Sequence, residues 1–112
     1  MEYTGEQRRK HFRVEYPLVY RPRFTLNGNK FPVLDISEKG VRFVRTNKGW
    51  TPEIERVKGA ITFHDEQSYF LTGSIVRQEE NQVALYLDEG LPFKRVMAEQ
   101  QYLIRRFIGY RD

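Results

Sequence analysis

Short runs of alternating apolar and polar residues fill the chain from Phe12 to Leu87, and turn-forming residues separate them. This alternation is typical of strands with one buried face, because successive side chains point to opposite faces of a sheet. The clearest stretch reads RFTLNGNKFPVLDI, in which two such runs flank Asn27-Gly28. Both residues of this dipeptide tolerate positive φ, so it predicts a hairpin turn.

Four further runs predict strands, and they read GVRFVRT, VKGAITF, YFLTGSIVRQ and QVALYLD. The polar stretches HDEQS and EENQ fall between them and are typical of turns. Six or seven short strands joined by tight turns indicate a mainly β protein, either an antiparallel barrel or a sandwich.

The hydrophobic period changes to that of an amphipathic helix over residues 91–110. Pro92 suits the first turn of this helix, and Gly109 suits its end. Seven apolar side chains fall within an arc of roughly 140°: Phe93, Val96, Met97, Leu103, Ile104, Phe107 and Ile108. We expect this face to pack on the strands, and a part of it could also bind another protein.

The charge of the chain is unevenly distributed, although the net value is only +4. Residues 1–25 and 91–112 each carry a net +3, whereas residues 26–90 carry a net −2. Basic ends favour an anionic partner near the termini, and exposed solvated lysines and arginines are the simpler interpretation.

The length of 112 residues indicates one domain, and the absence of cysteine excludes disulfides and thiolate metal sites. No apolar run approaches the roughly 18 residues of a membrane span, and the polar start MEYTGEQRRK does not resemble a signal peptide. We therefore expect a cytoplasmic protein without membrane insertion.

The chain offers little support for catalysis. Its two histidines, His11 and His64, lack the spacing of a metal site, and no nucleophile elbow, phosphate-binding glycine loop or zinc motif is present. We expect a binding protein rather than an enzyme, with no metal and no cofactor.

One candidate binding segment is the basic run RRKHFR at residues 8–13. Arginine presents planar, forked donors that suit phosphate oxygens and the edge of guanine, and it also stacks on bases. Arg9 and Arg13 are four positions apart and could converge on one ligand. Taken alone, the run is equally typical of a solvated N-terminal tail.

A second candidate segment is LDISEKGVRF, where a strand ends, turns and begins again. Asp35 could accept hydrogen bonds from the N–H groups of guanine, and Ser37 could both donate and accept. Gly40 allows positive φ or close approach of a ligand. These residue types are also common in ordinary turns.

Together, the two segments resemble the PilZ domain family. Arg8, Arg9 and Arg13 match its Arg-x-x-x-Arg element, and Asp35, Ser37 and Gly40 match its Asp-x-Ser-x-x-Gly turn. The resemblance covers essentially the whole chain as a single domain. It implies a six-stranded antiparallel β-barrel at residues 14–90, preceded by a flexible arginine-rich arm at residues 1–13 and followed by the helix at residues 91–110.

The resemblance also implies a ligand, the bacterial second messenger cyclic di-GMP. Arg9 and Arg13 would hold phosphates and contact guanine, Asp35 and Ser37 would contact a guanine, and Gly40 would shape the turn. An arginine directly before the first motif, as at Arg8, is associated with an intercalated ligand dimer. Arg77 is the less certain counterpart of a strand residue that stacks on a base.

We expect the arm to fold across the barrel when ligand neutralises its charges, and the new surface to signal to an effector protein, for example in motility or biofilm regulation. Two alternatives remain. A small barrel with basic ends and 14% aromatic residues could bind single-stranded nucleic acid, although its acidic middle disfavours a nucleic-acid polymer. A PilZ-type adaptor could also bind a protein without any nucleotide.

Overall fold

The computed structural model describes residues 12–45 and 55–107. Seven strands and one helix are present in this part of the chain. Their order is β1 Val14–Glu15, β2 Arg23–Leu26, β3 Asn29–Ile36, β4 Gly40–Val44, β5 Arg56–Thr62, β6 Ser68–Gln78, β7 Gln82–Leu87 and α2 Phe93–Arg106. Each predicted strand run is therefore confirmed.

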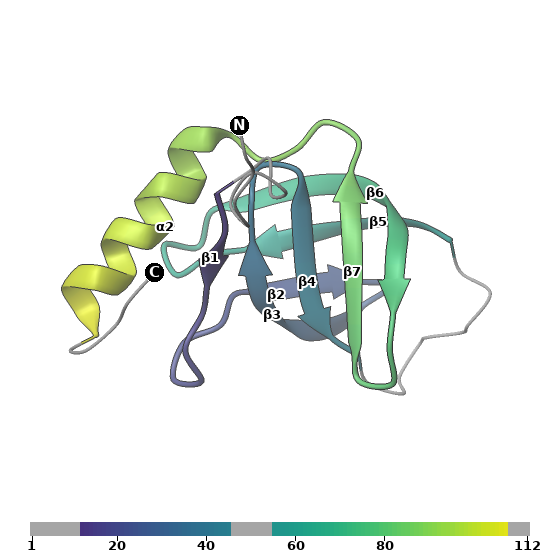
Figure 1. Cartoon of the computed structure of the whole chain (residues 1–112), viewed down its shortest axis with the longest axis horizontal. Coiled ribbons are helices and arrows are strands. Elements are labelled where there is room, and N and C mark those ends of the chain that lie inside the picture. Colours follow the sequence, from purple (N-terminus) through teal and green to yellow (C-terminus); the bar gives the residue numbers. More distant parts are fainter. Residues whose placement is uncertain (1–11, 46–54, 108–112) are drawn as a thin grey trace, which may run out of the picture.

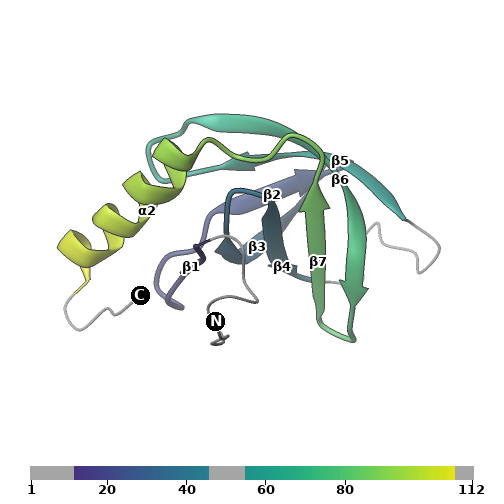
Figure 2. The ribbon, with the colours of Figure 1, turned by 45° about the horizontal axis from the view of Figure 1, so that its top comes forward.

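Six of the strands close into an antiparallel barrel (Figures 1 and 2). They follow the order β3-β2-β5-β6-β7-β4, and a further pairing of β4 with β3 closes the ring. The short β1 adds to the second half of β3, where Val14 pairs with Ile36 and Glu15 with Asp35. This closed mainly β fold confirms the barrel expected from the resemblance, and it excludes an open sandwich.

Alternation along the strands places the apolar residues inside the barrel. Phe24, Phe31 and Phe43 are fully buried. The ring centroid of Phe43 lies 4.9 Å from that of Phe24 and 5.6 Å from that of Phe31. The predicted hairpin connects β2 and β3, with φ of 53° at Asn27 and 80° at Gly28. Polar residues between the inward positions consequently form the outer surface of the sheet.

The helix α2 lies beside β1 and the turn between β5 and β6, on the side of the barrel away from β7 (Figures 1 and 2). It is shorter than the predicted span of residues 91–110. Pro92 caps its start, and Phe107 already has extended backbone, with φ −121° and ψ 118°. Gly109, the expected end, lies outside the described residues.

The buried face of α2 also differs from the predicted apolar arc. Val96 and Leu103 are buried as expected, but Phe93 and Ile104 are about half exposed. Glu99 and Gln100 are buried in their place. The face is rotated because Glu99 accepts hydrogen bonds from two tyrosines of the barrel and from Arg95, and no apolar periodicity encodes such contacts.

Candidate functional site

A row of directly paired residues crosses five strands on the outer face of the barrel. The row runs from Glu15 on β1 through Asp35, Arg42 and Ala84 to Arg77 on β6. Side chains paired in this way lie on the same face of a sheet. Two residues expected in the site, Asp35 and Arg77, therefore share one surface.

An irregularity in β3 turns Asp35 toward this surface. Val33 pairs with Phe43 and Asp35 pairs with Arg42, so Leu34 is an extra residue on β3. Val33 and Phe43 both point into the core. In a regular strand Asp35 would point inward as well, because it lies two positions after Val33 and side chains alternate.

Asp35 is held by the guanidinium group of Arg42. The Nε and Nη2 atoms of Arg42 lie 2.8 and 2.5 Å from Oδ2 of Asp35. A third nitrogen, Nη1, donates to Oε1 of Gln82 at 2.9 Å. The carboxylate thus has a defined orientation before any ligand arrives, which lowers the entropic cost of binding.

The electrostatic surroundings of Asp35 are mixed. Burial raises the pKa of its carboxyl above the ordinary value, and only 6% of the residue is exposed. Hydrogen bonds from Arg42, its charge and the charge of Arg13 act in the opposite direction, and Glu15 adds a smaller upward effect. The charge of Arg13, just before β1, therefore acts on the carboxyl of Asp35.

Ser37 and Gly40 form the turn that follows Asp35. The backbone N–H of Ser37 donates to the carbonyl oxygen of Gly40 at 2.9 Å. A Cβ atom at Gly40 would lie 3.3 Å from Oγ of Ser37 and 3.4 Å from the carbonyl oxygen of Leu85. A side chain at this position would fit only if Ser37 moved by a few tenths of an ångström, and the φ of Gly40 lies outside the left-handed region.

Beside this turn lies an aromatic ring that sequence reasoning missed. Tyr86 on β7 pairs with Gly40, is 52% exposed, and has Nζ of Lys39 at 5.3 Å from its ring centroid. Because Gly40 has no side chain, part of the Tyr86 ring stays open to a stacking group. The missed residues Arg42 and Tyr86 had one signal in the sequence, their outward position between buried residues of alternating strands.

Arg77 lies at the far end of the row. It is three strand spacings from Asp35, or about 14 Å across the sheet, and its Nε is 3.2 Å from Oε2 of Glu79. Both partners are largely exposed, with 72% of the Arg77 side chain accessible. Such a surface ion pair is weak, so Arg77 is free to turn toward a ligand.

The remaining expected residues, Arg8 and Arg9, lie outside the described residues, as does most of the predicted arm at residues 1–13. The structure therefore brings together Arg13, Asp35, Ser37 and Gly40, with Arg77 on the same face. Within residues 12–45 and 55–107, three or more side chains that could jointly hold a metal ion are not found. No helix in this part of the chain is long and apolar enough to cross a membrane.

Comparison with known proteins gives a family and a fold. A model of the PilZ domain matches residues 7–110. Among solved structures, an uncharacterized protein from Legionella aligns with a TM-score of 0.60 and 20% identity, over 85% of this chain and 97% of that one. The Bacillus subtilis inhibitor of motility (MotI/DgrA) aligns with a TM-score of 0.56 and 19% identity, over 95% of this chain. The aligned region spans 54% of that protein, and no curated protein sequence matches.

Proposed function

This chain belongs to the PilZ domain family, and on that premise we propose that it is a receptor for cyclic di-GMP that signals to a protein partner. The observation that carries the proposal is the Asp35–Arg42 pair on the outer face, with the charge of Arg13 also acting on the Asp35 carboxyl. A carboxylate and an arginine side by side suit a ligand that carries both guanine N–H donors and phosphate oxygens.

Each polar group of the site has a chemical role in this proposal. Arg9 and Arg13 bind the phosphates and contact guanine, and Asp35 accepts hydrogen bonds from guanine N–H groups. Ser37 adds a hydroxyl that donates or accepts, and Gly40 leaves room for the ligand. Arg77 stacks on a base at the other end of the row, and Tyr86 offers a second stacking surface.

The site can be mapped by nuclear magnetic resonance. We expect saturating cyclic di-GMP to shift the backbone amide signals of residues 35–42 and 84–86 and of Arg77. The signals of residues 58–61, on the strand β5, should stay in place and serve as the internal reference. Shifts confined to residues outside the row, or no shift at all, would contradict the proposal.

Stoichiometry is a separate question, because Arg8 precedes the Arg9–Arg13 element. We propose that the chain binds an intercalated dimer of cyclic di-GMP. Equilibrium dialysis should then saturate at two ligand molecules per chain, and Arg8→Ala should lower this number to one. Saturation of the wild-type chain at one molecule would rule out the dimer and leave the receptor function standing.

The proposed output is a surface made jointly by the ligand and residues 1–13. Ligand phosphates would neutralise Arg8, Arg9 and Arg13 and hold this segment against the barrel. We expect saturation with ligand to slow amide exchange in residues 5–13. The partner would be an effector in motility or biofilm control, and unchanged exchange in this segment would argue against the switch.

A further inference from the structure

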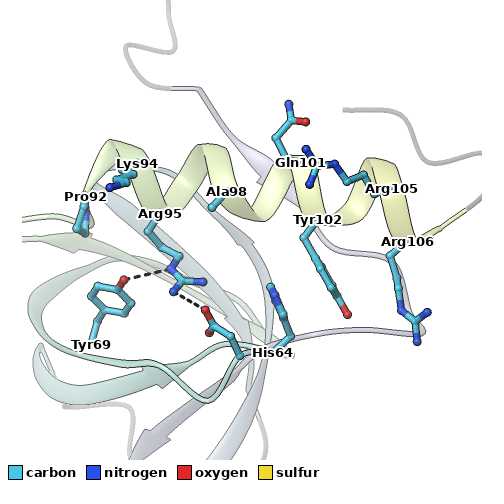
Figure 3. A pocket seen from close by; sticks show the side chains of 11 residues that line it. His64, Tyr69, Pro92, Lys94, Arg95, Ala98, Gln101, Tyr102, Arg105 and Arg106 are labelled. Carbon is cyan, nitrogen blue, oxygen red and sulfur yellow. Dashed lines mark hydrogen bonds and ion pairs between the residues drawn. The ribbon is translucent and has the colours of Figure 1, made fainter.

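A groove of about 700 Å³ lies between α2 and the turn that joins β5 to β6 (Figure 3). Its residues come from two places, the helix and the strands around that turn. None of them belongs to the row on the outer face of β3, β4, β7 and β6. The volume is within the range of pockets that bind ligands.

The charges on the floor of the groove are already paired. Arg95 donates to Oη of Tyr69 at 3.1 Å and to Asp65 at 2.8 Å (Figure 3). It also donates to the buried Glu99 at 3.1 Å. Tyr102 stacks on the imidazole of His64, with ring centroids 3.5 Å apart and planes within 8°. The floor therefore offers flat aromatic surface but no unpaired cation.

The rim of the groove, by contrast, carries three exposed cations: Lys94, Arg105 and Arg106. Within residues 12–45 and 55–107, none of the three has a hydrogen bond or ion pair to an acidic group. Among the described residues, Asp65 is the one acidic residue that lines the groove, and Arg95 neutralises it. The rim is consequently a positively charged surface that favours anionic ligands.

The spacing of these cations defines the size of the occupant. Lys94 and Arg105 are 11 positions apart in a continuous helix, which is about 16 Å along its axis, and they point in nearly the same direction. Ala98 and Gln101 lie between them on the same stripe and carry no charge. A small anion could reach only one end, whereas an extended peptide of about five residues spans the distance.

We propose that this groove binds an extended acidic peptide segment of a partner protein. The peptide would lie along α2 with carboxylates near Lys94 at one end and near Arg105 and Arg106 at the other. Its central side chains would pack on the Tyr102–His64 stack and Tyr69. The proposal does not depend on cyclic di-GMP, because it uses a different surface of the barrel.

The test uses the full chain and a fluorescein-labelled hexaglutamate peptide, with binding followed by fluorescence anisotropy at about 50 mM salt, where electrostatic screening is moderate. We expect Lys94→Glu/Arg105→Glu to weaken binding at least tenfold. The matched control Arg23→Glu/Lys58→Glu changes the net charge equally at exposed strand positions and should stay within twofold of wild type. Amide signals of Ala98 and Gln101 should shift on peptide addition.

Equal weakening in the two double variants would show non-specific attraction to a basic protein and would overturn the proposal. Absence of binding to the wild-type chain would overturn it as well. If circular dichroism shows that the charge-reversed variant does not fold, Lys94→Gln/Arg105→Gln replaces it, with Arg23→Gln/Lys58→Gln as its control. The helix variant should again bind the peptide more weakly than its control.

Discussion

Asp35 is nearly buried on the outer face of the barrel, where a carboxylate loses most of its hydration. Burial raises the pKa of its carboxyl, and the hydrogen bonds and charge of Arg42 only partly compensate. The charged carboxylate of Asp35 therefore destabilises the folded state. A residue of this kind is better suited to hold a ligand than to hold the fold.

The first prediction concerns the stability of Asp35→Asn. Because the folded pKa lies above the ordinary value of about 3.9, the contribution of Asp35 to stability weakens as the pH rises from about 4 through the folded pKa. Asp35→Asn, which does not titrate, should therefore be more stable relative to wild type at pH 7 than at pH 4. Urea unfolding at pH 4 and pH 7 measures this difference.

Asp88 serves as the control, because its pKa is shifted in the opposite direction from that of Asp35. Its hydrogen bonds with Arg56 and Thr72 lower its pKa to about 2. Stability from Asp88 is present above about pH 4 and is lost as the pH falls toward 2. Asp88→Asn should thus destabilise at pH 7. A larger loss of stability at pH 7 for Asp35→Asn than for Asp88→Asn would contradict the account of Asp35.

The sequence indicated which residues belong to the candidate site, but not which way their side chains point. Asp35, Ser37 and Gly40 stood out by their chemistry in a turn. The extra residue Leu34, which turns Asp35 outward, left no pattern that could be read beforehand. Arg42 was visible only as a polar residue in an alternating strand, because its ion pair depends on the register between β3 and β4.

The helix α2 is attached to the barrel through a buried polar cluster as well as through apolar packing. Glu99 is fully buried, and its Oε1 accepts from Oη of Tyr16 at 2.7 Å and of Tyr20 at 3.3 Å. Its Oε2 accepts from Nη1 of Arg95 at 3.1 Å and lies 3.3 Å from Nδ1 of His64. This cluster fixes the rotation of the helix and thereby the shape of the groove.

A second prediction follows for Glu99→Leu. The variant leaves the guanidinium of Arg95 and the hydroxyl of Tyr16 without a buried acceptor, which should cost about 3–5 kcal/mol of unfolding free energy. Gln101→Leu, an exposed change on the same helix, should stay within about 0.5 kcal/mol of wild type. Chemical denaturation measures both, and similar values for the two variants would refute the structural role of Glu99.

A third prediction uses the tyrosine of this cluster. Burial, and then the negative charge of Glu99, raise the pKa of Tyr16 far above its ordinary value of about 10. The folded state therefore keeps the Tyr16 proton, and the stability that this gives is complete below about pH 10 and is lost as the pH rises further. Tyr16→Phe should be less stable than wild type by about 1.5–3 kcal/mol at pH 7.

The difference between Tyr16→Phe and wild type should shrink above pH 10, because only the wild-type chain has this phenol to ionise. Thermal unfolding at pH 7, 9 and 10.5 follows the trend. A difference that stays constant over this range would show that ionisation of Tyr16 does not limit alkaline stability.

Hydrophobic periodicity predicted the strands but not the buried face of α2. Strand runs were predictable because alternation directly reflects the inside and outside of the barrel. The face of α2 was not, since Glu99 is polar in the sequence but buried in the fold through Tyr16, Tyr20 and Arg95. His64 and Asp65 lie in an exposed turn, as their sequence predicts, and they also contact the helix through Tyr102, Glu99 and Arg95.

At the scale of the whole molecule, the two proposed binding surfaces lie on different elements of the fold. The outer face of β3, β4, β7 and β6 carries Asp35, Arg42 and Arg77, and the groove beside α2 carries Lys94, Arg105 and Arg106 (Figure 3). A receptor with this layout could hold its ligand on one side and an acidic segment of its partner on the other.

The most direct measurement is isothermal titration calorimetry of cyclic di-GMP into wild type, Arg13→Ala and the control Arg23→Ala. The charge of Arg13 acts on the carboxyl of Asp35, whereas Arg23 is an exposed residue of β2. We expect wild type and Arg23→Ala to bind with the same affinity, and Arg13→Ala to lose binding. Absence of binding to wild type, or micromolar affinity retained in Arg13→Ala, would contradict the proposed site.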